Sequence, residues 1–195
     1  MNETVKKQCP WKILLGDWNT MTLITVAVGA IVFGLLSVFG DFSVFGRFRF
    51  PTAMLIPVAV GGIYGTLPAF FIVFIGSLAS NFLRVSGFWF DMTMSYAVLG
   101  LFIGMLPLYG AKISEGIFTV KHAAIFAVCC LIGQAVAFGV VFPILASVFR
   151  PDYFFGIYPV QAFINGLYTT TTLVISGILL LSLMAKLYRK KTKTV

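Results

Sequence analysis

The sequence carries few charged residues for its length. Of its 195 residues, 10% are charged and 59% are hydrophobic, whereas a soluble domain normally carries about 25% charged residues. Such a composition cannot cover a water-facing surface, so we expect the outer surface to face lipid and no soluble domain to be present. The net charge of +8 does not indicate nucleic-acid binding, because the basic residues lie in the two tails and at loop boundaries instead of along one helix face. Anionic lipid headgroups of the bilayer are the expected partners of these charges.

Residues that carry catalytic or redox chemistry are also scarce. The chain has one histidine, His122, beside Lys121 at the end of an apolar segment. Cys9 lies in the N-terminal tail, while Cys129 and Cys130 are adjacent in an apolar segment, where cysteine is commonly a small buried hydrophobe. The sequence contains no P-loop, HExxH motif or nucleophile elbow, and no acidic residue in the middle of a span, which disfavours a carboxylate proton or sodium relay. We therefore expect no enzymatic activity, no metal and no cofactor, and a chain that cannot hydrolyse ATP by itself.

Apolar segments fill most of the chain. A membrane-spanning helix needs roughly 20 mostly apolar residues, with about 17–25 tolerated. We predict an all-α integral membrane protein with a single transmembrane domain over 1–195. Because the first apolar segment is about twenty residues long and follows a polar stretch, we expect no cleavable signal peptide. The six predicted spans are 20–39, 51–64, 68–83, 92–108, 122–149 and 160–187.

The separation of the second and third spans depends on Gly65 and Pro68, which interrupt one apolar run. A single long helix here would leave five spans and place the two tails on opposite sides of the membrane. Lysine and arginine in short loops favour the cytoplasm, and both tails are basic. With six spans, ten of the 14 basic residues fall on the tail side and four on the other. We therefore predict six spans with both termini in the cytoplasm of a prokaryotic cell, in its plasma membrane.

Polar and aromatic residues concentrate toward the predicted outer side. The loops 40–50, 84–91 and 150–159 each combine arginine, aspartate and several aromatic residues. One interpretation is an aromatic belt at the headgroup level, with local arginine–aspartate pairs tying the loops. The other is a site for a flat polar or anionic solute, held by stacking, cation–π contacts and bidentate hydrogen bonds. The candidate substrate-binding residues are Arg47, Arg49, Asn81, Arg84, Trp89, Asp91, Gln134, Tyr158, Gln161 and Asn165.

Amides within the spans are the second element of this hypothesis. A buried amide must find a hydrogen-bond partner, either on another helix or on a ligand. Both interpretations stay open for Gln134 and for the amides near the outer ends of the spans. The run Thr169–Thr172 is instead expected to bond back to its own helix.

Three segments resemble the S components of energy-coupling-factor (ECF) transporters. They are GAIVFGLLSVFGDFSVFGRF, PVAVGGIYGTLPAFFIVFIGSLASNFL and GFWFDMTMSYAVLGLFIGMLP, and the likeness extends over roughly 20–190, closest to uncharacterised members labelled riboflavin-transporter-like. The resemblance implies a six-helix bundle that captures a vitamin or related micronutrient from outside, under its first external loop. It further implies docking on a membrane coupling subunit carried by two ATPases, which use the ATP, and toppling to release the cargo inward.

Docking in this family uses small residues four apart on the first helix, typically alanines. The nearest match is Ala30 and Gly34, with Ala27 one turn before, so the resemblance assigns these three to the coupling-subunit interface. Small residues four apart also recur in the other spans, where internal bundle packing is the usual explanation. Two further functions stay open from the residues alone: a non-transporting membrane scaffold or accessory subunit, and a membrane-embedded enzyme.

Overall fold

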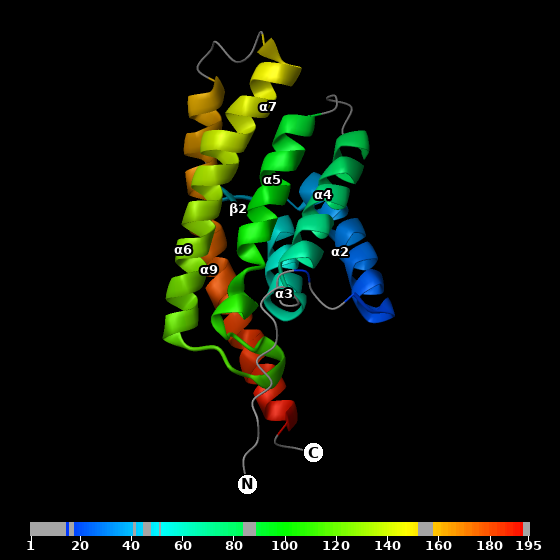
Figure 1. Ribbon diagram of the computed structural model, residues 1–195, viewed down its shortest axis with the longest axis vertical. Coiled ribbons are helices and arrows are strands. Elements are labelled where there is room, and N and C mark those ends of the chain that lie inside the picture. Colours follow the sequence, from blue (N-terminus) through cyan, green and yellow to red (C-terminus); the bar gives the residue numbers. More distant parts are fainter. Residues whose placement is uncertain are drawn as a thin grey trace.

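The computed structural model describes residues 15, 18–40, 42–44, 48–50, 52–83, 89–151 and 158–192. In this part the chain forms six helical passes and one small β-hairpin (Figure 1). The elements are α2 (Thr20–Phe39), β1 (Phe42–Val44), β2 (Phe48–Phe50), η1 (Thr52–Met54), α3 (Leu55–Tyr64), α4 (Thr66–Leu83), α5 (Phe90–Ile103), η2 (Leu106–Tyr109), η3 (Ile113–Glu115), α6 (Val120–Val136), η4 (Ala137–Val141), α7 (Phe142–Phe149) and α9 (Tyr158–Thr192). The predicted all-helical class with six helices is confirmed.

Five helices of the described part are long and apolar enough to cross a membrane. They cover Thr20–Phe39, Thr66–Leu83, Phe90–Tyr109, Val120–Phe149 and Phe163–Lys191. The remaining pass, Thr52–Tyr64, is a shorter apolar helix. Large hydrophobic side chains are exposed on the outside of α2, α4, α6, α7 and α9, as expected where lipid replaces water.

The first pass begins and ends where its sequence predicts. The side chain of Asn19 accepts a hydrogen bond of 2.8 Å from the backbone N–H of Thr22, which caps the N-terminus of α2. At the other end, Gly40 donates its N–H to the carbonyl of Leu36 and ends the helix. The observed bounds of α2 coincide with the predicted span 20–39.

The second and third passes are separate helices, as predicted. Gly65 alone separates α3 from α4, and its φ of +100° lies in a region that side-chain-bearing residues rarely adopt. The chain reverses at this residue, so α4 packs back against α3. The alternative of one long helix with five passes is therefore wrong.

Small residues allow the passes to approach one another closely. A Cβ added at Gly76 of α4 would lie 2.7 Å from the carbonyl oxygen of Ala30 on α2, and one added at Gly34 would lie 3.1 Å from the carbonyl oxygen of Gly76. A Cβ added at Gly104, after α5, would lie 2.6 Å from the Cα of Thr66 at the start of α4. Several of the small residues predicted to support packing thus form backbone contacts inside the bundle.

The fifth pass contains a widened turn that the sequence analysis did not predict. The segment η4 is π-helical, and the N–H of Phe142 bonds to the carbonyl of Ala137 five residues earlier. Pro143 has no N–H, and in a regular α-helix its ring would clash with the carbonyl of Gly139. Widening the turn just before the proline relieves that clash and keeps α6 and α7 in one continuous pass.

The first connection is a hairpin, where only a loop was expected. β1 and β2 are antiparallel, with Phe42 opposite Phe50 and Val44 opposite Phe48. Strand β2 contacts α9, so this connection folds back against the last helix of the bundle instead of standing free.

Candidate functional site

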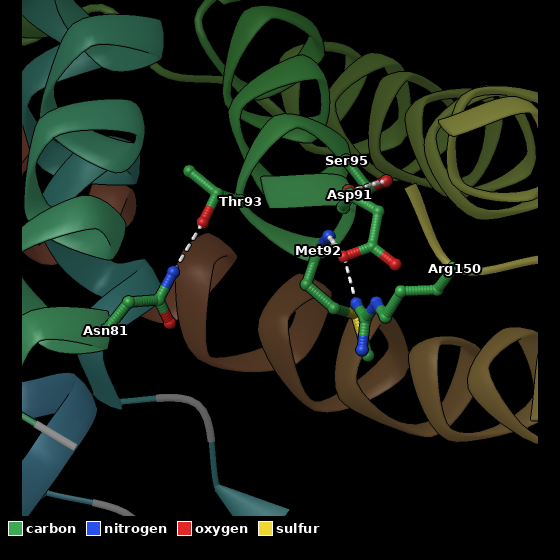
Figure 2. Close-up of polar contacts among 6 residues, drawn as sticks. All are labelled: Asn81, Asp91, Met92, Thr93, Ser95 and Arg150. Atoms are coloured by element: carbon green, nitrogen blue, oxygen red, sulfur yellow. Dashed lines mark hydrogen bonds and ion pairs between the residues drawn. The ribbon is translucent and has the colours of Figure 1, made fainter. Parts of the chain in front are cut away.

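A charged cluster joins the start of α5 to the end of α7. Asp91 is only 1% exposed, and its Oδ1 accepts hydrogen bonds from the Arg150 guanidinium and, at 2.9 Å, from the backbone N–H of Met92 (Figure 2). Asp91 lies in the first turn of α5, where the helix dipole favours a negative charge. The Arg150 guanidinium also stacks over the ring of Trp89, 4.0 Å from its centroid. Arg150 and Asp91 therefore compensate each other's charge where the start of α5 meets the end of α7.

A neutral hydrogen bond ties α4 to α5 beside this cluster. The Asn81 amide nitrogen donates to Thr93 Oγ1 at 2.9 Å (Figure 2). Asn81 is partly buried and Thr93 is 1% exposed. The amide thus has the helix–helix partner that the sequence analysis left open as one of two interpretations.

A second polar centre lies deeper, between α6 and α9. Gln134 is 1% exposed, and its Oε1 accepts a hydrogen bond of 2.8 Å from Thr170 Oγ1, itself fully buried. The Gln134 Nε2 atom has no hydrogen-bond partner among the residues that the structure describes. It lies against Gly166 of α9, where an added Cβ would be 1.9 Å away. The Oδ2 atom of Asp91 is the other buried side-chain atom without a partner in the described part of the chain.

Aromatic residues separate the two polar centres. The ring of Tyr96 on α5 meets the ring of Phe138 edge-on, with 5.1 Å between centroids, and Phe138 and Phe142 lie 6.2 Å apart. Phe163 of α9 lies over Gly139, with 3.7 Å between its Cε2 and the position of an added Cβ. The widened turn η4 carries Phe138 and Gly139, so it brings this aromatic layer between α5 and α9.

One flank of α9 carries polar side chains beside the deeper centre. Asn165, Thr169, Thr172 and Ser176 follow one another at spacings of four, three and four, which places them along one side of the helix. Asn165 is exposed, and the other three are partly buried. The hydroxyls of Thr169, Thr172 and Ser176 donate to carbonyls of their own helix, as expected for the threonine run.

The structure describes half of the predicted substrate-binding side chains. Asn81, Trp89 and Asp91 gather at the end of the bundle, whereas Gln134 and Asn165 lie deeper on α6 and α9. Those outside the described residues or side chains are Arg47, Arg49, Arg84, Tyr158 and Gln161.

The three residues assigned to the coupling interface have different surroundings. Ala27 is exposed on α2, whereas Ala30 is 3% exposed and Gly34 is buried against α4. Only Ala27 therefore lies on a surface that another protein could contact without separating α2 from α4.

Sequence reasoning missed three residues of these centres. Arg150 was not among the candidate substrate-binding residues, Thr170 was expected to bond its own helix, and Gly166 was not singled out. For Gly166 and Thr170, the helical periodicity of α9 is the sequence signal that could have indicated burial. These two residues share one face of the helix with Leu173 and Gly177.

Comparison with known proteins decides the family. A model of the family described as ECF-type riboflavin transporter, S component, matches residues 17–188. The chain belongs to this family. The predicted resemblance is confirmed, and membership makes this S component a membrane transport subunit, not an enzyme.

Several bacterial relatives are similar over much of the chain. A UPF0397 protein of Clostridium perfringens strain SM101 is 27% identical over 174 residues, which are 87% of this chain and 91% of the relative. A UPF0397 protein of Lactobacillus johnsonii is 27% identical over 133 residues, 65% of this chain and 68% of the relative. A UPF0397 protein of Aliivibrio salmonicida is 27% identical over 124 residues, 62% of this chain and 67% of the relative. No solved structure matches the chain.

Proposed function

We propose that this S component captures a neutral, fused-ring vitamin from outside the cell for an ATP-driven ECF importer, with riboflavin as the first candidate. The observation that carries the proposal is the family match over residues 17–188, whose description names riboflavin. The chain itself supplies binding, while a membrane coupling subunit and two ATPases supply the energy. The captured molecule would be bound among α5, η4 and α9.

The chemistry of the described residues supports a neutral aromatic cargo. The partly buried rings of Tyr96 and Phe163 offer faces or edges for stacking. The exposed amide of Asn165 offers both a donor and an acceptor. The charges of Asp91 and Arg150 compensate each other, so among the side chains that the structure describes here, neither is left free to hold a phosphate.

Binding of riboflavin to the purified full-length chain is the direct test. Titration calorimetry should give a saturable heat with riboflavin and a much weaker one with its phosphate ester. Asn165→Ala should weaken riboflavin binding by about 5- to 150-fold, because a polar group of the cargo loses its partner (about 1–3 kcal/mol). Thr171→Val is the matched control, since Thr171 is exposed and its hydroxyl donates to the Leu167 carbonyl of its own helix. Absence of riboflavin binding to the unmodified chain would refute this cargo.

We further propose that both termini lie in the cytoplasm. An even number of passes supports this, because the first turn of α2 and the last turn of α9 point toward the same end of the bundle (Figure 1). The basic last turn of α9, with Arg189, Lys190 and Lys191, favours the cytoplasmic side. In a variant without the native cysteines, Asn2→Cys and Thr194→Cys should both resist a membrane-impermeant maleimide in intact cells and react after permeabilisation. Labelling of only one of the two in intact cells would contradict the proposed topology.

A further inference from the structure

The buried amide of Gln134 has a donor that the described residues do not use. Thr170 Oγ1 donates to Oε1 at 2.8 Å, which fixes the orientation of the amide and turns Nε2 toward α9. Nε2 is buried and has no partner among the described residues. A buried unpaired donor costs free energy in the folded protein, so its persistence calls for an explanation.

Gly166 is what allows the amide to lie in this position. An added Cβ at residue 166 would be 1.9 Å from Nε2 and 3.0 Å from the amide carbon. No side chain could occupy the position unless the Gln134 amide moved away. Glycine in the middle of a helix is unfavourable by itself. Gly166 therefore lowers the helix propensity of α9 at the position where the Gln134 donor contacts this helix.

The surroundings of the donor connect it to the aromatic layer. Phe163 lies one turn before Gly166 on α9, is partly buried, and covers Gly139, which has no side chain to hold the ring in place. Gly139 belongs to the widened turn η4, five residues after Gln134. Phe163, which meets the aromatic layer at Gly139, and Gly166, which meets Nε2, therefore lie one turn apart on the same helix.

We propose that Gln134 determines the specificity for cargo by donating from Nε2 to a ring acceptor, with Thr170 as its positioning residue. This inference rests on the proposed function. The acceptor would be a ring carbonyl oxygen or an unprotonated ring nitrogen of a neutral fused heteroaromatic system. A neutral amide held by a neutral hydroxyl suits such a group, because neither partner brings a charge that the cargo would have to compensate. The site selects an acceptor at this position and rejects rings that carry an N–H there, because two donors would face each other.

The test uses the full-length chain in detergent with riboflavin as the probe. Gln134→Met removes the donor at nearly constant volume, and Gln134→Glu replaces it with an acceptor. We expect the Kd for riboflavin to rise about tenfold or more in Gln134→Met, which corresponds to the loss of one hydrogen bond, and further in Gln134→Glu. Thr170→Val should weaken binding by less, because the donor remains but loses its orientation. Thr171→Val is the matched control on the same helix and should bind as the unmodified chain does, since Thr171 is exposed and its hydroxyl donates to the Leu167 carbonyl of α9.

Infrared difference spectra of riboflavin labelled with ¹³C at its ring carbonyls separate a hydrogen bond from a structural effect. A donated hydrogen bond lowers the carbonyl stretching frequency, so one labelled carbonyl should return to a higher frequency in Gln134→Met. If the acceptor is a ring nitrogen instead, ¹⁵N-labelled riboflavin should show the corresponding shift by nuclear magnetic resonance. Should Gln134→Met fail to fold, Thr170→Val carries the same spectroscopic test.

The outcomes distinguish this inference from the function on which it rests. If the unmodified chain binds no riboflavin, the proposed cargo and the role of Gln134 toward it both fail. If the unmodified chain binds riboflavin but Gln134→Met binds it equally well with unchanged spectra, the function stands and the specificity role is wrong.

Discussion

Gly104→Ala should destabilise the protein by about 3 kcal/mol, the upper part of the range for overpacking a tightly filled site. The added Cβ would lie 2.6 Å from the Cα of Thr66 and 2.7 Å from the carbonyl oxygen of Gly65. Both are backbone atoms, so no side-chain rotation can relieve the collision, and α4 and α5 would have to separate. The backbone of Gly104 has a φ of −76° and a ψ of −2°, which any residue can adopt. The expected loss of stability therefore comes from steric overlap and not from backbone strain.

Thermal unfolding in detergent measures this effect. A loss of about 3 kcal/mol corresponds to a fall in Tm of roughly 6–12 °C for a chain of this size. Gly139→Ala is the matched control, because its added Cβ would lie 3.7 Å from the nearest atom of Phe163, an ordinary contact distance. The control should change Tm little. Equal melting temperatures for Gly104→Ala and the unmodified protein would show that α4 and α5 do not meet as closely as described.

The helical passes could be predicted from the sequence because their signals are local. Runs of apolar residues marked the spans, and Gly65 marked the reversal between α3 and α4 because its positive φ requires glycine. The hairpin β1–β2 could not be predicted in the same way. Its strands have three residues each, too few for an alternating pattern to separate from a loop rich in phenylalanine. The widened turn η4 depends on how a helix accommodates Pro143, which the apolar run does not encode.

The polar centres were less predictable because their partners are distant in sequence. Asp91 and Arg150 are 59 positions apart, and the sequence, which suggested arginine–aspartate pairs among the loops, did not indicate that these two residues pair. The expectation that hydroxyls of the threonine run bond their own helix is confirmed for Thr169, Thr171 and Thr172. Thr170 is the exception, because the helical repeat turns it toward α6 and Gln134. The sequence indicated that buried amides need hydrogen-bond partners. Only the packing of α9 on α6 shows that the Thr170 hydroxyl is the partner of the Gln134 amide.

The structure also changes which variant tests coupling to the ATP-driven module. Gly34→Leu would place a bulky group where an added Cβ already lies 3.1 Å from the carbonyl oxygen of Gly76. Such a variant would disturb the packing of α2 on α4, so a loss of transport could not be separated from a loss of folding. Ala30 has the same disadvantage, because it is only 3% exposed. Ala27 is the residue of the three whose side chain can be enlarged without entering the bundle.

Ala27→Trp should abolish riboflavin uptake by a complete transporter while leaving riboflavin binding to the isolated chain unchanged. Ala27 is a small residue on an exposed apolar face of α2, between Ile24, which is 53% exposed, and Ile31, which is 62% exposed. Helices associate in lipid by close van der Waals contact, so a bulky side chain at the point of approach holds the two backbones apart and removes those contacts. A loss of about 1.4 kcal/mol in docking free energy already weakens docking tenfold, and a tryptophan at the centre of the contact should exceed this. Binding should persist because the proposed cargo site lies among α5, η4 and α9.

Transport in proteoliposomes that contain the coupling subunit and ATPases, together with calorimetry on the isolated chain, checks both parts of this expectation. Ala124→Trp is the matched control, since Ala124 is an exposed alanine on α6, away from α2. It should leave both uptake and binding intact, because a tryptophan there meets only lipid. Normal uptake by Ala27→Trp would mean that this face of α2 contacts lipid and that docking uses another surface. Loss of riboflavin binding in Ala27→Trp would instead place α2 at the cargo site, since the substitution adds volume only outside the bundle and should not disturb a site on the far helices.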